Sequence, residues 1–270
     1  MANKGGGDKS KISEIKIICL SGLPRSGSTW LGAILSQNPR FYVTNPQSPF
    51  VELLWRNYSL WDEPNWKADF LELQDIKIPY LRKVASSYFK EFTDSPVILD
   101  VRRHWHSIKN IEMYADVFGE LPKIICPVRN VEEIVASFIN LFKRNGRSWG
   151  KDSASGNLFD TPYKLLLESY NSKYRDCLLF VGYEDLIKDA YSLLDRIYEF
   201  IGEPLYNHDL NSIMAHEPCV RSDKEYNLSG LHLVSSGIVE SITDARDCLS
   251  DKQFELLKEL NFWKSEQLWH

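Results

Sequence analysis

The sequence predicts an α/β protein with three layers, α/β/α, in which helices cover both faces of a five-stranded, mainly parallel sheet. Short apolar runs alternate with longer amphipathic segments along most of the 270 residues, a pattern typical of parallel strands joined by crossover helices. A glycine-containing turn at 22–29, GLPRSGST, directly follows the first apolar run. The length suits a single domain over 12–270, preceded by a disordered tail at 1–11.

Each expected strand is a short, mostly apolar run, and longer amphipathic segments separate most of these runs. The expected strands are Lys16–Ser21, Phe41–Thr44, Val97–Val101, Ile124–Val128 and Leu178–Gly182. Helices are expected near 29–37, 76–92, 106–118, 131–144, 161–175 and 191–201. Parallel sheets bind ligands beyond the carboxyl ends of their strands, and Gly22, Arg102 and Arg129 each follow a strand there.

The turn at 22–29 matches the phosphate-binding pattern GxxxxGK[ST], except that Ser28 replaces the lysine. That lysine reaches the terminal phosphates of a nucleoside triphosphate, so its loss argues against transfer of a γ-phosphoryl group. Backbone N–H groups at a helix N-terminus still favour an anion. Ser26, Ser28 and Thr29 add hydroxyl groups, and Arg25 adds a cation.

A second candidate binding element lies at 123–138, where KIICPVRNVEEIVASF reads as a strand followed by a helix. Arg129 stands at the carboxyl end of the strand, and Ser137 lies two turns into the helix. Asn130 and Glu133 have the spacing of a capping box, with Asn in place of Ser or Thr.

These two elements together resemble the donor site of sulfotransferases. GLPRSGST is similar to the 5'-phosphosulfate loop of that family, and the pair of Arg129 and Ser137 is similar to its 3'-phosphate site. The resemblance runs from about residue 16 to about residue 232, and the arginine in the loop resembles the bacterial and tyrosylprotein branch. It implies a P-loop-like fold and the co-substrate 3'-phosphoadenosine 5'-phosphosulfate (PAPS), with 3'-phosphoadenosine 5'-phosphate (PAP) as the product. The donor-binding residues implied are Pro24, Arg25, Ser26, Gly27, Ser28, Thr29, Arg129, Ser137, Tyr183, Arg221 and Ser222.

The catalytic residues are also suggested by resemblance. Arg102, Arg103 and His104 resemble the Lys-x-His of cytosolic sulfotransferases, in which the lysine contacts the sulfuryl group and the histidine is the base. This implies that Arg102 contacts the sulfuryl group, that His104 is the general base, and that Arg25 neutralises the leaving 5'-phosphate.

Two other residues are rivals for the role of base. The tyrosylprotein branch uses a glutamate shortly after the first helix, and TNPQSPF at 44–50 contains no carboxylate. Glu52, a little further along, could replace it. His106 is the second rival, and Asp100 could orient the ring of either His104 or His106.

Composition excludes some function classes. The 32 Lys and Arg residues against 37 Asp and Glu give a net charge of −5, so no global positive field would gather nucleic acid. No stretch of 18 apolar residues occurs, so no membrane span is expected. The 5 cysteines are widely spaced without a CxxC pair and indicate reduced thiols in a cytoplasmic protein. No metal requirement is expected.

Three segments could belong to the site. Trp55, Tyr58, Trp61 and Trp66 lie among prolines in an irregular segment and could line an acceptor pocket, or could pack into a core. The polar, glycine-rich segment 145–160 indicates a surface loop, and 203–237 is a long segment with little periodicity. Loops of this kind can close over a bound nucleotide.

The sequence therefore predicts a PAPS-dependent sulfotransferase that acts on a hydroxyl or amine. The alternatives are a P-loop nucleotide or small-molecule kinase and a non-catalytic module that binds PAPS or PAP. The acceptor could be a carbohydrate, a lipid, a small metabolite or a peptide tyrosine.

Overall fold

The computed structural model of the chain describes residues 15–44, 47–64, 71–149, 153–214, 223, 228–231 and 244–264. In the helix Ser153–Tyr170 (α7), side chains are described from residue 158 onward. The predicted tail at 1–11 and the nominated residues Arg221 and Ser222 lie outside the described residues.

A five-stranded parallel sheet forms the centre of the described residues. Its strands are β1 (Lys16–Leu20), β2 (Phe41–Val43), β3 (Val97–Val101), β4 (Ile124–Val128) and β5 (Leu178–Gly182). The spatial order is β2-β3-β1-β4-β5, and every neighbouring pair is parallel. The five predicted strands are confirmed. Because β3 and β4 lie on opposite sides of β1, the carboxyl ends of these three strands are neighbours, and ligands of parallel sheets bind beyond such a reversal of strand order.

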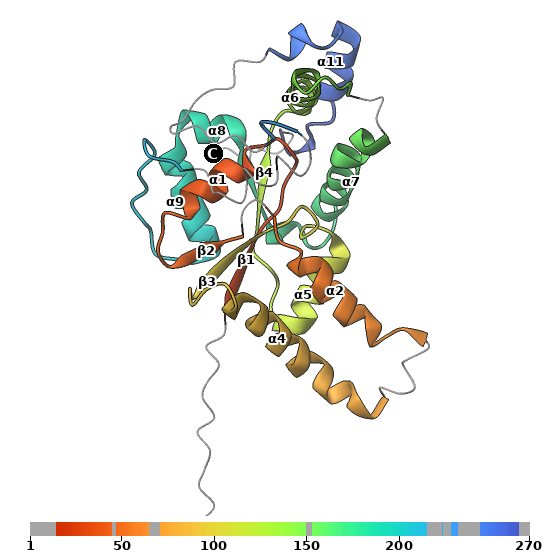
Figure 1. Cartoon of the computed structure of the whole chain (residues 1–270), viewed down its shortest axis with the longest axis vertical. Helices are drawn as coiled ribbons and strands as arrows, with labels where there is room; N and C mark the ends of the chain where they lie inside the picture. The colour runs from red at the N-terminus through yellow and green to blue at the C-terminus, as the bar shows by residue number, and fades with distance from the viewer. Residues whose placement is uncertain are drawn as a thin grey trace, which may run out of the picture.

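Helices cover both faces of this sheet, which confirms the predicted three-layer fold (Figure 1). On one face lie α1 (Ser28–Leu35), α8 (Tyr183–Lys188) and α9 (Ala190–Ile201). On the other lie α2 (Phe50–Leu60), α4 (Gln74–Lys90), α5 (Ile108–Phe118) and α7. Near the carboxyl end of β4 lie α6 (Val131–Arg144) and α11 (Asp251–Lys258). Short 3-10 turns occupy Leu71–Leu73, Arg175–Cys177, Ala245–Asp247 and Phe262–Lys264.

Two hydrophobic cores flank the sheet because side chains alternate along each strand. Ile18 and Leu99 pack with α1 and α9 on one face. Ile17 and Ile98 pack with α2, α4 and α5 on the other. Both faces are therefore apolar, which explains why the strands appear in the sequence as continuous apolar runs.

The stretch between Phe41 and Trp66 was expected to be irregular, but much of it is helical. Residues 50–60 form α2, whose Phe50, Val51 and Leu54 are buried. The rings of Trp55 and Tyr58 lie 5.9 Å apart and pack against the core. Trp55 and Tyr58 thus pack into the core, which is the second of the two alternatives. Trp66 lies outside the described residues.

The prediction of a loop at 145–160 is wrong for the second half of that segment. The helix α7 begins at Ser153, eight residues before the predicted start near 161. Phe159 and Leu166, which are two helical turns apart, are both buried. Burial of this apolar stripe outweighs the weak helix propensity of the polar and glycine residues before it. Residues 203–214, in contrast, form neither helix nor strand, as expected.

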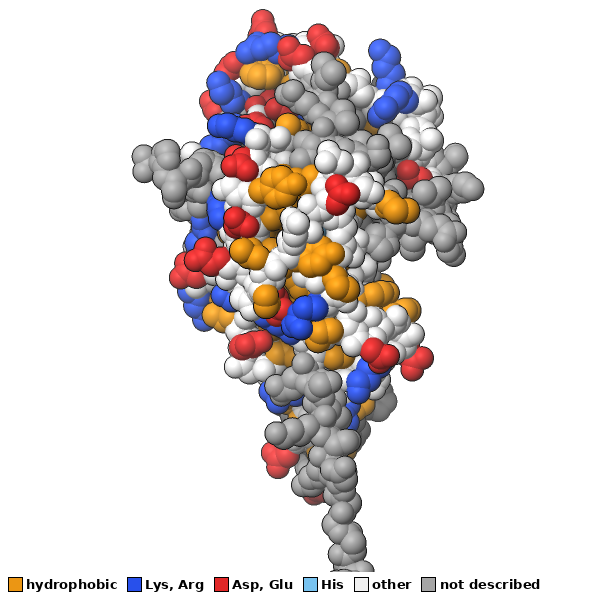
Figure 2. All heavy atoms as spheres, turned by 90° about the vertical axis from the view of Figure 1, so that its left-hand side faces the viewer, with side chains coloured by type: hydrophobic (Ala, Val, Ile, Leu, Met, Phe, Trp, Pro, Cys, Tyr) orange, Lys and Arg blue, Asp and Glu red, His pale blue; other side chains and the backbone are white. Residues whose placement is uncertain are grey.

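The surface carries separate apolar residues among charged ones. Figure 2 shows the side of the molecule that carries α9, where apolar side chains lie between acidic and basic ones. The large apolar residues exposed on α9 and in the segment after it are Tyr191, Leu205, Tyr206 and Met214. Among the described residues, no helix combines the length and the apolar character that crossing a bilayer requires. Cys19, Cys126 and Cys177 are buried free thiols, and burial raises the pKa of each.

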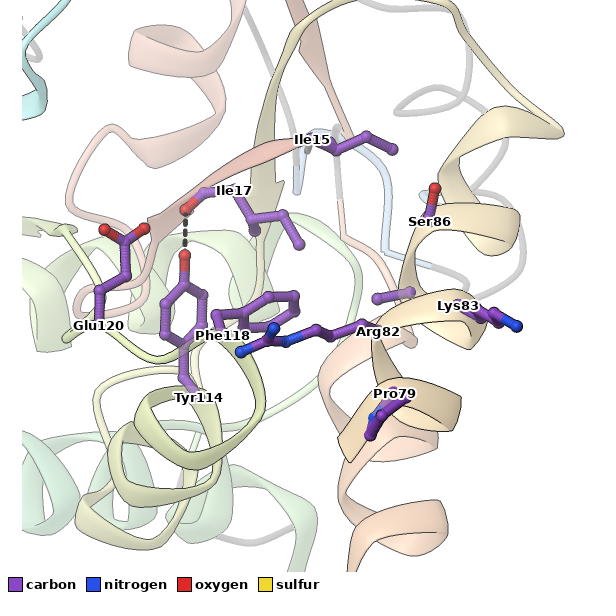
Figure 3. A pocket seen from close by; sticks show the side chains of 10 residues that line it. Ile15, Ile17, Pro79, Arg82, Lys83, Ser86, Tyr114, Phe118 and Glu120 are labelled. Atoms are coloured by element: carbon purple, nitrogen blue, oxygen red, sulfur yellow. Dashed lines mark hydrogen bonds between the residues drawn. The ribbon is translucent and has the colours of Figure 1, made fainter. Parts of the chain in front are cut away.

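A cavity of about 320 Å³ opens at the amino end of β1, between α4 and α5 (Figure 3). Its walls include Ile17, Ala85 and Phe118. Arg82, which also lines it, donates from Nε to the carbonyl of Val117 in the last turn of α5, where the helix dipole favours a cation. This cavity lies at the opposite end of the strands from the predicted binding residues.

Candidate functional site

The turn between β1 and α1 depends on two glycines. A Cβ atom on Gly22 would lie 2.1 Å from the carbonyl oxygen of Pro127 in β4, so a side chain there would collide with the backbone of the neighbouring strand. Gly27 has φ 87° and is the N-cap of α1, and glycine adopts that left-handed conformation without a steric cost. The sequence thus brings the turn close against β4.

The N-cap residue of α1, Gly27, has no side chain with which to cap the helix. Its first N–H groups and the positive end of the helix dipole therefore favour an anion at this turn. Ser28 and Thr29 belong to the first turn of α1. The buried Ser26 instead donates its hydroxyl hydrogen to the carbonyl of Leu23 at 2.5 Å, so its side chain shapes the turn.

Arg25 connects the turn with α6. It has φ 60°, and its Nε donates to the hydroxyl of Ser137 at 3.1 Å. Its Nη1 donates to the backbone carbonyl of Leu231. Burial, followed by the nearby Arg129 and Arg144, lowers the pKa of Arg25 to about 10. The guanidinium therefore remains positive at neutral pH, and the neighbouring cations form a positive site.

Arg129 adjoins this turn from the end of β4. Its Nε donates to Glu133 Oε2 at 2.7 Å, and 6% of its side chain is exposed. Its guanidinium lies 4.4 Å from the ring centre of Tyr183. That ring also borders the turn, because a Cβ atom on Gly27 would lie 3.0 Å from it. The structure therefore brings together Arg25, Ser137, Arg129 and Tyr183 as predicted from the sequence.

The start of α6 differs from the predicted capping box. Asn130 is the N-cap, but its side chain makes no capping hydrogen bond. Its amide group donates to Glu133 at 2.9 Å and to Glu184 at 2.6 Å. The helix begins at the predicted residue, whereas the predicted capping interaction was wrong, because the Asn130 side chain donates to two carboxylates instead.

Three predicted residues meet at the carboxyl end of β3. Glu52, in the first turn of α2, accepts two hydrogen bonds on Oε1: one from Arg102 Nε at 2.6 Å and one involving His104 Nδ1 at 2.9 Å. Burial would raise the pKa of Glu52, but the hydrogen bonds with His104 and Arg102 outweigh it, and the pKa is lowered. Glu52 therefore stays ionised at neutral pH. Its other oxygen, Oε2, is buried and has no hydrogen-bond partner among the residues that the structure describes.

His106 has a different environment from His104. It is fully buried, with Nε2 3.0 Å from the carbonyl of Pro162 and Nδ1 2.9 Å from the hydroxyl of Ser21. A carbonyl only accepts, so Nε2 carries the hydrogen and Nδ1 accepts from Ser21. Burial lowers the pKa of His106 to about 4. The ring is neutral and connects β1 with α7.

The expectation that Asp100 orients a histidine ring is wrong. Asp100 is buried and accepts hydrogen bonds from the indole of Trp105 at 2.7 Å and from Thr44 at 3.0 Å. Successive side chains of a strand point to opposite faces of the sheet. The side chain of Asp100 therefore points to the face opposite to that of the next residue in the strand. Burial raises the pKa of this carboxyl to about 6.

The chain matches the sequence model of the sulfotransferase family over residues 18–208. It belongs to that family. The enzyme class predicted from the sequence, a sulfotransferase, is thereby confirmed. No curated protein shows significant sequence similarity to the chain.

Solved sulfotransferase structures share this fold. The sulfotransferase domain from the curacin biosynthetic pathway is 16% identical, with a TM-score of 0.53, over 91% of this chain and 96% of its own. Mouse sulfotransferase SULT7A1, solved in complex with PAP, is 15% identical, with a TM-score of 0.51, over 92% of this chain and 83% of its own. At such low identity these similarities show the fold alone.

Sequence reasoning missed three contributors to the site of this sulfotransferase. Arg144 lies two helical turns after Ser137 on the same face of α6, and this spacing could have revealed it. Asn145 exchanges hydrogen bonds with the backbone of Ser229 at 2.9 and 3.2 Å, and the same segment provides the Leu231 carbonyl that contacts Arg25. Asn261, the third, contacts the start of α6, and no local signal in the sequence indicates this.

Proposed function

We propose that this sulfotransferase transfers the sulfuryl group of PAPS to a hydroxyl or amine of an acceptor and releases PAP. The observation that carries the proposal is the contact of Arg25 with Ser137 beside Arg129, at a helix N-terminus whose N-cap residue is a glycine. Two cations and a helix dipole suit a nucleotide with phosphates at two positions. PAP, which mouse SULT7A1 holds in its structure, is such a nucleotide.

The proposed chemistry needs charge neutralisation at the donor and a base at the acceptor. Arg25 and the first N–H groups of α1 neutralise the negative charge that develops on the 5'-phosphate as its bridging S–O bond breaks. Arg129 and Ser137 hold the 3'-phosphate, while Tyr183 packs beside them. Arg102 attracts the sulfuryl oxygens, and the transferred group forms a new bond to the acceptor oxygen or nitrogen.

His104 is the proposed general base. An ionised Glu52 accepts the hydrogen of His104 Nδ1, which leaves the lone pair on Nε2 to receive the proton of the acceptor. Part of the His104 side chain, 42%, is exposed and so accessible to an acceptor. His106 lacks this access because both of its ring nitrogens are engaged in the interior.

Binding of PAP compared with ATP tests the proposed function. PAP at 100 times its dissociation constant should add about 2.7 kcal/mol to the free energy of unfolding, which raises Tm by several degrees. ATP with magnesium should do little. Equal stabilisation by both would favour the kinase alternative and contradict the proposal.

Turnover separates an enzyme from a PAP-binding module. Labelled PAPS, incubated with mixtures of carbohydrate, lipid, small-metabolite and tyrosine-peptide acceptors, should yield a labelled product and PAP. Normal PAP binding without transfer to any acceptor class would support the non-catalytic module.

A further inference from the structure

A side chain from the C-terminal part of the chain caps the helix that follows Arg129. Asn261 Oδ1 accepts a hydrogen bond from the backbone N–H of Val131, the first residue of α6, at 2.8 Å. Its Nδ2 donates to Glu132 Oε2 at 2.9 Å and to the carbonyl of Lys258 at 3.0 Å. Asn261 is 7% exposed, so these interactions are formed in the interior, where an unpaired polar group is costly.

This cap replaces one that the local sequence fails to provide. The first N–H groups of a helix need acceptors from outside the helix. Asn130 is the N-cap, but its amide donates to Glu133 and Glu184 instead. The N–H of Val131 therefore depends on Asn261, which lies far away in the sequence.

The capped turn also orients Arg129. Glu133, in the first turn of α6, binds Arg129 Nε through Oε2 and the Asn130 amide through Oε1. One guanidinium nitrogen is thus held, and the two Nη nitrogens, which bond to no acceptor among the described residues, can bind a phosphate. Any shift of the first turn moves Glu133 and, with it, the guanidinium of Arg129.

The residues around Asn261 hold it against α6. The carbonyl of Leu260 accepts from the Tyr163 hydroxyl at 3.0 Å. Trp263 is 2% exposed and lines a cavity of about 320 Å³ together with Arg129 and Tyr183. The C-terminal segment is therefore one wall of the space beside Arg129.

We propose that Asn261 is a positioning residue for the donor, acting through the first turn of α6 to hold Arg129 in the direction that binds the 3'-phosphate. The inference rests on the proposed function, because it assigns the 3'-phosphate to Arg129. It adds the C-terminal segment, which the family match at 18–208 does not reach, to the donor site.

A double-mutant cycle tests this inference by titration calorimetry with PAP and with 5'-AMP. Asn261→Leu removes both the acceptor and the donor, and we expect PAP to bind about tenfold more weakly, while 5'-AMP, which lacks the 3'-phosphate, changes less than twofold. In an Arg129→Ala background, Asn261→Leu should weaken PAP binding by less than twofold, because coupled residues are not additive. Asn171→Leu, which removes an exposed asparagine whose side chain donates to the carbonyl of Leu167 in the turn after α7, is the matched control and should bind PAP normally.

A rescue variant keeps the test informative if Asn261→Leu fails to fold. Asn261→Asp combined with Glu132→Gln retains an oxygen for the N–H of Val131 and reverses the hydrogen bond with residue 132, but it loses the bond to the Lys258 carbonyl, so PAP should bind more tightly than to Asn261→Asp alone and more weakly than to the wild type. Asn261→Asp alone places two carboxylates together and should bind PAP weakly.

The outcomes separate this inference from the proposed function. Equal loss of PAP and 5'-AMP affinity, or full additivity with Arg129→Ala, would overturn the positioning role. Failure of the wild type to bind PAP would instead overturn the proposed function and this inference with it.

Discussion

Glu52 receives two hydrogen bonds on one carboxylate oxygen, from Arg102 and from His104. The bond from Arg102 neutralises part of the charge of Glu52. The bond with His104 selects the tautomer of the imidazole. Glu52 Oε2 is buried and accepts no hydrogen bond within the described part of the chain. The proposed base His104 and its rival Glu52 thus form one hydrogen-bonded unit.

Substitution of His104 and of Glu52, one at a time, separates their roles. His104→Ala should reduce kcat by about 10²–10⁴ because it removes the base, and it should leave PAP affinity unchanged because the base contacts the acceptor. Glu52→Gln should reduce kcat less, since the amide oxygen can still accept from His104. Steady-state kinetics with a reactive acceptor and calorimetry with PAP measure both effects. Near-normal turnover of His104→Ala with a large loss in Glu52→Gln would transfer the role of base to Glu52.

His106 connects pH to stability. Its folded pKa of about 4 is below the usual 6.5, so the neutral ring stabilises the fold above pH 6.5, and this contribution is lost as pH falls towards 4. The shift corresponds to about 3 kcal/mol. The buried Asp100 acts in the opposite direction, because its raised pKa stabilises the fold as the carboxyl becomes protonated.

The pH dependence is measurable as a difference between two proteins. The free energy of unfolding of the wild type minus that of His106→Gln should stay constant above pH 7 and fall by about 3 kcal/mol between pH 7 and pH 4. Asp100 is present in both proteins, so its effect cancels. Urea denaturation at several pH values provides the measurement. A difference independent of pH would show that His106 is not held neutral.

The turn between β1 and α1 is an element whose shape depends on a neighbouring strand. The N–H of Leu23 donates to the carbonyl of Pro127 in β4 at 3.0 Å, and Gly22 allows this close approach. The turn could be predicted from the sequence because the spacing of its glycines is a local property. Its contact with β4 could not be predicted, because that contact joins parts of the chain that several elements separate.

Replacement of Gly22 by alanine tests the close approach. The added Cβ atom would meet the carbonyl of Pro127 at 2.1 Å, so the turn must move away from β4. We expect a loss of about 1–3 kcal/mol in the free energy of unfolding and severe loss of PAP binding. Gly146→Ala is the control: its φ is 68° but no atom lies within 4 Å of the added Cβ, so it should cost about 1 kcal/mol and bind PAP normally. Normal PAP binding by Gly22→Ala would contradict this role.

Helices were less predictable than strands. The start of α7 at Ser153 and the presence of α2 depend on burial of apolar stripes against the sheet. Intrinsic propensity in the polar segment before Phe159 favours a loop, and tertiary packing overrides it.

In the whole molecule, the strand order gathers the predicted site residues at the carboxyl ends of the central strands. The strands β3, β1 and β4 are adjacent, so Arg102 and His104, the glycine-containing turn, and Arg129 follow neighbouring strands. The net charge is −5, yet Arg129 and Arg144 lie close enough to Arg25 to contribute to the lowering of its pKa. The positive charge is therefore local, which suits a small phosphorylated ligand better than a polyanion.

The sequence by itself determined the five strands, the glycine-containing turn, the cations after β3 and β4, and the family. These features depend on spacing within short segments, where apolar periodicity and glycine positions have direct structural meaning. The tertiary structure alone decided which carboxylate meets His104, that Asp100 binds Trp105, and that Asn261 caps α6. Glu52 and His104, or Val131 and Asn261, meet only because distant segments pack on one sheet, and no local pattern specifies such pairs.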